Sequence, residues 1–114
     1  MIEHISIHSY KKEADITKYT YENTIKHICK KHPNCPSFAA EFFASEVASK
    51  KWENASIGKA VGITMQNYLR HHMTDYDCHL LNGMDRSEAR ARVQPRIAAM
   101  LAIWQRKNTG TPER

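Results

Sequence analysis

Apolar residues in this chain recur at intervals of three and four positions, in segments that prolines and glycines interrupt. This spacing places side chains on one face of an α-helix, whereas a strand shows alternation at every second position. Only the first ten residues alternate, with Ile5 and Ile7 between polar neighbours, and a strand there would need a partner, such as a second copy of the chain. The sequence therefore predicts an all-α fold, a small bundle of about five helices to which a short N-terminal strand could be added.

Prolines delimit the first two predicted helices. Periodic apolar residues predict a helix over residues 15–31, and Pro33 prevents its continuation. Pro36 is suited to the first turn of a second helix, over residues 36–48, because the amide that it lacks would have no helical partner there. Trp52 follows this second helix, and we expect its ring to close one end of the core.

Residues 56–72 allow two interpretations. As one helix, they place Ile57, Val61 and Met65 on a single face. As two helices, they turn at Gly62, because glycine costs about 1 kcal/mol in a helix interior and readily adopts the positive φ of a turn. We prefer the second interpretation, which gives a helix-turn-helix arrangement.

Two later helix starts carry capping signals. Thr74 precedes Asp77 by three positions, and Asp85 precedes Glu88 by the same spacing. In such a pair, the first side chain accepts a hydrogen bond from an amide of the opening turn, and the second reaches back to the cap amide. We therefore predict structural caps at Thr74, Asp77, Asp85 and Glu88, and we expect Gly83 to end the first of these helices.

The last predicted helix is the longest and contains a proline. Its apolar residues recur at helical spacing to about residue 107, and Pro95 lies inside it. Because proline removes one backbone donor, we expect a kink near Val93. Residues 108–114 include a glycine and a proline, and we expect them to form a disordered tail after a single helical domain over residues 1–107.

The composition is typical of a small globular domain, with 41% hydrophobic and 25% charged residues. Its 114 residues suit one domain, and 17 Lys and Arg against 12 Asp and Glu leave a net charge of +5. Three cysteines are an odd number, which fits reduced thiols better than a disulfide framework. Nowhere do about 18 apolar residues follow one another. We therefore expect a cytoplasmic protein with no membrane span and no cofactor.

Several motifs of the C-terminal half occur together in one known family. A histidine-rich stretch precedes the box Thr74-Asp75-Tyr76-Asp77, and a helix rich in alanine and arginine follows it. The residues concerned are Arg70-His71-His72-Met73, the box itself, Leu80-Leu81, Gly83, Arg86, Ala89-Arg90-Ala91-Arg92-Val93, Pro95-Arg96 and Trp104. In this order they resemble a bacterial family catalogued as domain of unknown function 2293. The resemblance implies no activity, because the family has no established one.

The helix-turn-helix interpretation predicts contact with nucleic acid. The second helix would present Arg70 and His71. The last helix would extend this basic surface with Arg86, Arg90 and Arg96. Guanidinium groups suit bidentate contacts with phosphate, and the positive net charge favours an anionic partner. We therefore predict a non-enzymatic module that binds DNA or RNA. The alternative for these arginines is a solvated helix face on which they pair with acidic neighbours.

A second class of function needs no nucleic acid. The N-terminal arm and aromatic residues such as Tyr10, Tyr19 and Trp52 could bury against a partner or a second copy. Aromatic side chains are enriched at protein interfaces because they bring a large apolar area with little loss of side-chain entropy. The chain would then be a protein-interaction module or a homo-oligomer.

A third class, a metal-dependent hydrolase, rests on residues that often bind metals. One cluster comprises His71, His72, Asp75, Asp77, Cys78 and His79, and a second comprises His27, Cys29, His32 and Cys35. A hydrolase would centre on His71, His72, Asp75 and His79. Neither cluster has a recognised zinc spacing, and the H-E-x-x-H pattern is missing from the sequence. We therefore predict no bound metal and no catalytic residue.

Overall fold

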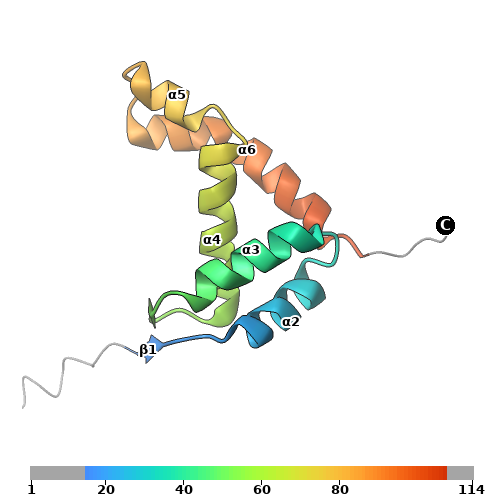
Figure 1. Ribbon diagram of the computed structural model, residues 1–114. Helices are drawn as coiled ribbons and strands as arrows, with labels where there is room; N and C mark the ends of the chain where they lie inside the picture. The colour runs from blue at the N-terminus through green and yellow to red at the C-terminus, as the bar shows by residue number, and fades with distance from the viewer. Residues whose placement is uncertain (1–14, 108–114) are drawn as a thin grey trace, which may run out of the picture.

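A computed structural model describes residues 15–107, which form a mostly helical domain (Figure 1). Its elements, in chain order, are β1 (Ile16–Thr17), α2 (Tyr21–Lys31), α3 (Ser37–Ala48), β2 (Trp52–Glu53), α4 (Ile57–His72), α5 (Tyr76–Leu81) and α6 (Arg86–Gln105). Five helices confirm the predicted fold class. The strand considered near Ile5 and the tail over residues 108–114 lie outside the described residues.

A two-stranded antiparallel ribbon shortens the first helix. β1 pairs with β2 so that Ile16 faces Glu53. The Asp15 amide donates to Asn54 Oδ1 at 3.0 Å, and the Asn54 amide donates to the Asp15 carbonyl oxygen at 2.9 Å. The prediction of a helix from residue 15 was therefore wrong, because the backbone pairs with β2 first. α2 begins only after Thr20, whose hydroxyl oxygen accepts a hydrogen bond from the Asn23 amide at 3.1 Å.

α4 is one continuous helix, so the preferred two-helix interpretation was wrong. Ser56 caps it by accepting a hydrogen bond from the Lys59 amide at 3.1 Å. Gly62 lies inside the helix, and the positive-φ glycine among the described residues is Gly83 instead. The buried face of α4 consists of Ala60, Val61, Thr64, Met65 and Leu69. Burial of this whole face outweighs the cost of about 1 kcal/mol that one glycine adds.

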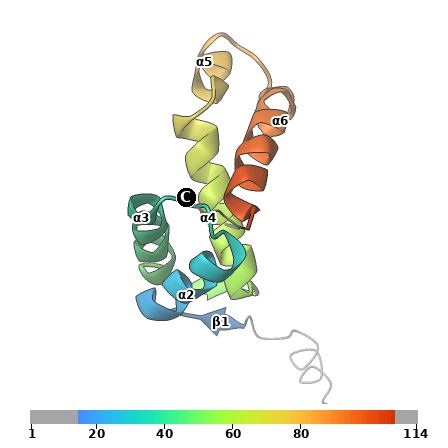
Figure 2. The same cartoon turned by 90° about the vertical axis from the view of Figure 1, so that its right-hand side faces the viewer.

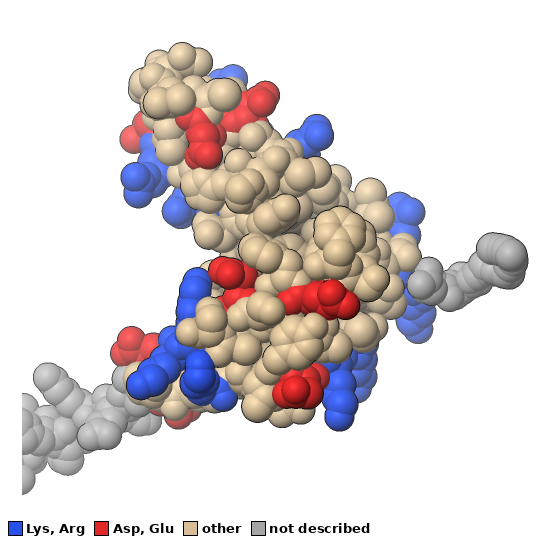
Figure 3. Space-filling model, viewed as in Figure 1, with Lys and Arg blue, Asp and Glu red and all other residues tan. Residues whose placement is uncertain are grey.

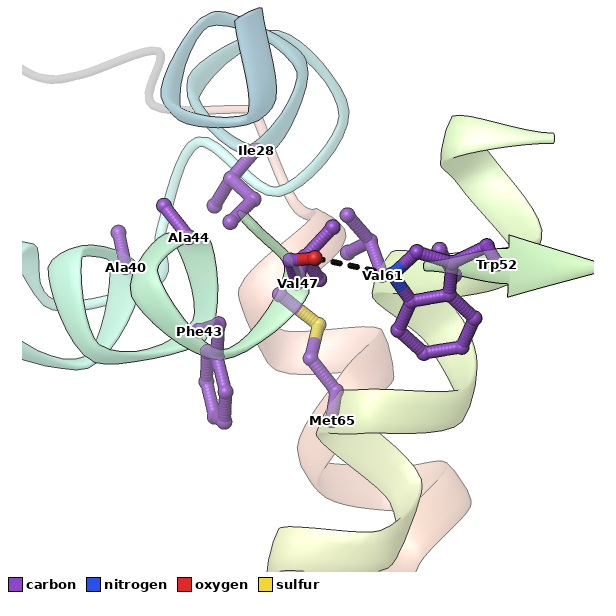
Figure 4. Packing of buried hydrophobic residues seen from close by; sticks show 9 residues of the cluster. Ile28, Ala40, Phe43, Ala44, Val47, Trp52, Val61 and Met65 are labelled. Atoms are coloured by element: carbon purple, nitrogen blue, oxygen red, sulfur yellow. Dashed lines mark hydrogen bonds between the residues drawn. The ribbon is translucent and has the colours of Figure 1, made fainter. Parts of the chain in front are cut away.

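The larger hydrophobic core surrounds the amino-terminal half of α4 (Figure 4). It comprises Ile28, Ala40, Phe43, Ala44, Val47, Trp52, Ala60, Val61 and Met65, which come from α2, α3, β2 and α4. Trp52 closes this core, and its Nε1 donates to the Val47 carbonyl oxygen at 2.9 Å (Figure 4). The buried indole therefore satisfies its polar atom, as a ring at the edge of a core must.

A smaller core lies around the carboxyl-terminal half of α4, where α5 and α6 meet it (Figure 2). It comprises Leu69, Tyr76, Ala89, Val93 and Ile97. The partly buried side chains Tyr68, Leu101 and Trp104 pack against both cores and join them. Pro95 lies inside α6, whose ribbon changes direction along its length (Figure 1). The two cores are therefore stacked along α4, with α6 beside them.

Candidate functional site

The box between α4 and α5 holds its polar groups differently from the predicted cap. Thr74 Oγ1 accepts a hydrogen bond from the Tyr76 amide at 3.1 Å and donates to the Arg70 carbonyl oxygen. Asp77 Oδ1 lies 2.8 Å from His71 Nδ1 and does not take part in a cap. His71 also meets the Tyr76 ring edge to face. The carboxylate therefore orients an imidazole, a role that the spacing of the box did not indicate.

At the start of α6, one side chain makes the capping contacts. Asp85 Oδ2 accepts hydrogen bonds from the Ser87 amide at 3.1 Å and from the Glu88 amide at 3.4 Å. The Glu88 carboxylate lies 3.7 Å from the Arg92 guanidinium, one helical turn further on. Both members of this pair are exposed, and such surface pairs contribute little to stability. Arg92 is thus partly neutralised on the helix surface.

Three of the five residues predicted to bind nucleic acid have partners within the fold: His71, which pairs with Asp77 as described above, and the two arginines Arg70 and Arg96. Arg70 donates from Nη1 to Asn67 Oδ1 at 3.4 Å, and its guanidinium carbon lies 5.7 Å from the centroid of the Tyr76 ring. Arg96 donates from Nε to the Met73 carbonyl oxygen at 2.9 Å. This bond joins α6 to the turn between α4 and α5. Both guanidinium groups therefore help to hold the α4–α5 junction.

Arg90 and Arg96 do not share one face of α6. Arg86 and Arg90 are exposed at the start of α6, one turn apart. At about 100° per residue, Arg90 and Arg96 lie about 120° apart around α6, on opposite edges of its buried stripe. Figure 3 shows Lys and Arg in several separate groups on the face that it presents, with Asp and Glu between them. A continuous basic stripe is not visible on that face.

An exposed apolar surface lies between α3 and α4, and the sequence did not indicate it. We call it the aromatic groove and define it by Phe38, Phe42, Ile63, Tyr68 and His72. The Phe42 and Tyr68 ring centroids are 5.3 Å apart, and those of Tyr68 and His72 are 4.5 Å apart. Two adjoining hollows of about 210 and 190 Å³ follow this row of rings. Phe38 is 76% exposed and Phe42 is 45% exposed.

Phe43 explains why the groove was missed. It is fully buried, whereas Phe42 beside it faces outward. α3 carries apolar residues on nearly all sides, so its periodicity does not identify the inner face. The one available signal was the pair Phe38 and Phe42, which are four positions apart and share a face that Phe43 does not occupy.

A third hollow, of about 440 Å³, adjoins the groove at the α4–α5 junction and is lined by His72, Met73, Thr74, Asp75 and Arg96. His72 thus borders both the groove and this hollow. Over residues 15–107, no three side chains of the kinds that bind metals come together in a geometry that could hold an ion. The third class of function, a metal-dependent hydrolase, gains no support from this arrangement.

The second predicted cluster partly assembles at the corner between α2 and α3. Cys29, His32 and Cys35 line one pocket of about 420 Å³. Burial, with the charge of His27, lowers the pKa of His32, and His32 Nδ1 is buried without a hydrogen-bond partner among the described residues. Burial and the nearby Cys29 raise the pKa of the Cys35 thiol to about 11. The imidazole and the Cys35 thiol are therefore held neutral at pH 7.

Comparison with known proteins identifies the family. None of the helices between residues 15 and 107 combines the length and apolarity that a membrane span requires. Comparison with curated proteins and with solved structures yields no match. One family model, described as "Uncharacterized conserved protein (DUF2293)", matches residues 27–105. The match extends beyond the C-terminal motifs to the last five residues of α2 and all of α3. Because it covers most of the chain, this protein belongs to the DUF2293 family of uncharacterized conserved proteins.

Proposed function

We propose that this chain is a protein-interaction module whose contact surface is the aromatic groove. The observation that carries the proposal is the exposure of Phe38 and Phe42 beside Tyr68, in a row of rings that borders two hollows. Single exposed apolar residues are common on protein surfaces, but a contiguous and concave apolar patch is typical of a binding site. The groove has both properties.

The composition of the groove also suits a protein partner. Phe42, Ile63 and Tyr68 line its larger hollow together with the polar side chains of Glu46, Lys50 and Asn67. Protein interfaces usually combine aromatic and apolar residues with polar ones in this way. Tyr68 is held by contacts with both Phe42 and Phe43, so the surface is ordered before a partner arrives. Such preorganisation lowers the entropy cost of association.

Selection of peptides from a random library against the native protein tests this proposal. We expect amphipathic sequences that bind the native chain and lose at least about tenfold in affinity when Phe42→Ser removes one ring of the groove. Tyr21→Ser is the matched control, because Tyr21 is an aromatic residue of α2 that is 37% exposed and lies outside the groove. Peptides that bind all three proteins equally, or no enrichment at all, would overturn the proposal.

Nucleic-acid binding is the second candidate, and the exposed pair Arg86 and Arg90 favours it. These two side chains lie one turn apart, and the chain carries a net charge of +5. Fluorescence anisotropy with single-stranded and duplex DNA should show binding that weakens steeply as salt rises. The double variant Arg86→Gln and Arg90→Gln should reduce binding more than the control Arg106→Gln. No signal at low salt, or equal binding by both variants, would reject this candidate.

A further inference from the structure

We infer that the partner of the aromatic groove is a second copy of this chain, whose α5 tip enters the groove. We define the α5 tip as residues 80–84, which comprise the last two residues of α5 and the turn that follows them. This inference rests on the proposed function, because it names the occupant of the same groove. It goes beyond that function in predicting a closed dimer in which each copy supplies both a tip and a groove.

The α5 tip presents an apolar side chain in an ordered position. Leu81 is 86% exposed, the highest value among the exposed large apolar residues, whereas its neighbour Leu80 packs against the smaller core. The turn after it is fixed by two backbone bonds, from the Gly83 amide to the Leu80 carbonyl oxygen and from the Met84 amide to the His79 carbonyl oxygen, each 3.0 Å long. Gly83 has a φ of 90°, which allows this tight reversal. Leu81 is therefore displayed rigidly.

The groove offers a matching apolar surface. Ile63 is 46% exposed and lines the same hollow as Phe42 and Tyr68. A leucine side chain that enters this hollow would contact rings and an aliphatic side chain while leaving water. Removal of the leucine side chain from water stabilises the contact, and each exposed ring that it covers adds to this gain. An apolar residue on a rigid tip and an apolar hollow on the same molecule are complementary.

Charge distribution favours the same pairing. Residues 73–88 include the α5 tip and contain more acids than cations. The four acidic residues are Asp75, Asp77, Asp85 and Glu88, and the one Lys or Arg is Arg86. Over residues 46–59, which include the groove residues Glu46 and Lys50, the three cations Lys50, Lys51 and Lys59 outnumber the two acids Glu46 and Glu53. The segment that contains the tip is therefore net negative, and the segment at one end of the groove is net positive. Such complementarity orients an encounter and disfavours tip-to-tip contact between two copies.

The position of the two surfaces makes the contact reciprocal. α5 projects beyond the carboxyl-terminal end of α4, whereas the groove lies between α3 and α4, so the tip lies outside the groove of its own chain (Figure 1). The left-hand outline of Figure 3 is indented between the lobe that holds α5 and the lobe that holds the end of α3. Two copies related by a two-fold axis can make the tip-to-groove contact twice. A contact that is made twice closes the assembly as a dimer.

Sedimentation equilibrium of the full chain tests the dimer. We expect a concentration-dependent dimer, and a dissociation constant that rises at least about tenfold for Leu81→Gln and, separately, for Phe42→Ser. Ile103→Gln is the control, because Ile103 is 47% exposed at the end of α6 and belongs to neither surface. Circular dichroism and thermal unfolding of each variant establish that it folds. A native chain that stays monomeric at several hundred micromolar would overturn the inference.

Mixing the two variants identifies which surfaces meet. In a heterodimer, the native tip of the Phe42→Ser chain faces the native groove of the Leu81→Gln chain, so one of two contacts is intact. The mixture should therefore associate more tightly than either variant alone. A mixture that associates no more tightly than either variant alone would overturn the tip-to-groove pairing. If the native chain is monomeric but selected peptides still bind the groove, the proposed interaction function is retained and only the inferred dimer is rejected.

Discussion

The two halves of α4 have different surroundings. The amino-terminal half is covered by α2, α3 and Trp52, and nine residues are buried in the core there. The carboxyl-terminal half packs against α5 and α6 around a smaller core of five buried residues. Tyr68, Leu101 and Trp104 contact both cores. The comparison suggests that the larger core dominates folding stability, whereas the smaller core holds the histidine-rich junction and the α5 tip in place.

The largest effect is expected from Phe43→Ala in the larger core. Phe43 is fully buried and contacts the rings of Phe42, Tyr68 and Trp104. Its truncation should lower the free energy of unfolding by about 3 to 5 kcal/mol, because it removes transfer energy and leaves a cavity. Urea denaturation followed by circular dichroism measures this change. A loss smaller than that of Ile97→Ala would contradict the ranking of the two cores.

A smaller effect is expected from Ile97→Ala in the smaller core. Ile97 is fully buried, and its truncation should cost about 2 to 4 kcal/mol. Hydrogen exchange should accelerate in α5 and in the first turns of α6 more than in α2 and α3, because local opening follows local packing. Equal acceleration throughout the chain would instead show that Tyr68, Leu101 and Trp104 couple the two cores into one cooperative unit.

Capping at the start of α6 should contribute about 1 kcal/mol. Asp85→Ala removes the acceptor for two amides and should destabilise the chain by about that amount. Asp77→Ala removes only the exposed partner of His71 and should change the free energy of unfolding by about 0.5 kcal/mol or less. Chemical denaturation of both variants gives the comparison. Equal losses would mean that Asp77 has a structural role that its exposed pair does not explain.

The smallest effect is a dependence of the free energy of unfolding on pH, and it concerns two histidines of α2 and its C-terminal cap, on the side of the larger core. Burial lowers the pKa of both His27 and His32 below the ordinary value of 6.5. Below pH 6.5 the unfolded chain therefore binds more protons at these residues, and the free energy of unfolding falls as pH drops through the lowered values. Substituting both residues by Gln should flatten this dependence between pH 7 and pH 5. An unchanged slope in the double variant would assign the acid sensitivity to other groups.

The sequence predicted the helices better than it predicted their junctions. Pro33 and Pro36 separate α2 from α3 as expected, and the helix after Asp85 begins where predicted. The single helix through Gly62 was one of two interpretations but not the preferred one, because glycine locally favours a turn, whereas tertiary packing of the buried face of α4 outweighs that preference. The contacts of the predicted nucleic-acid residues were likewise not visible in the sequence. Arg70 and Arg96, which were predicted to bind nucleic acid, also make contacts within the fold, and binding itself stays a prediction.

Local sequence by itself determined that this chain is helical and where most of its helices begin, because spacing, caps and prolines act within a few residues. Only the tertiary structure decided which side of each helix faces water. Phe42 and Phe43 are adjacent and chemically identical, yet one lines the aromatic groove and the other is fully buried. That difference depends on how α3 packs against α4 and on the contact of Phe43 with Trp104, which is distant in sequence. Long-range packing therefore created the surface that we propose as the functional site.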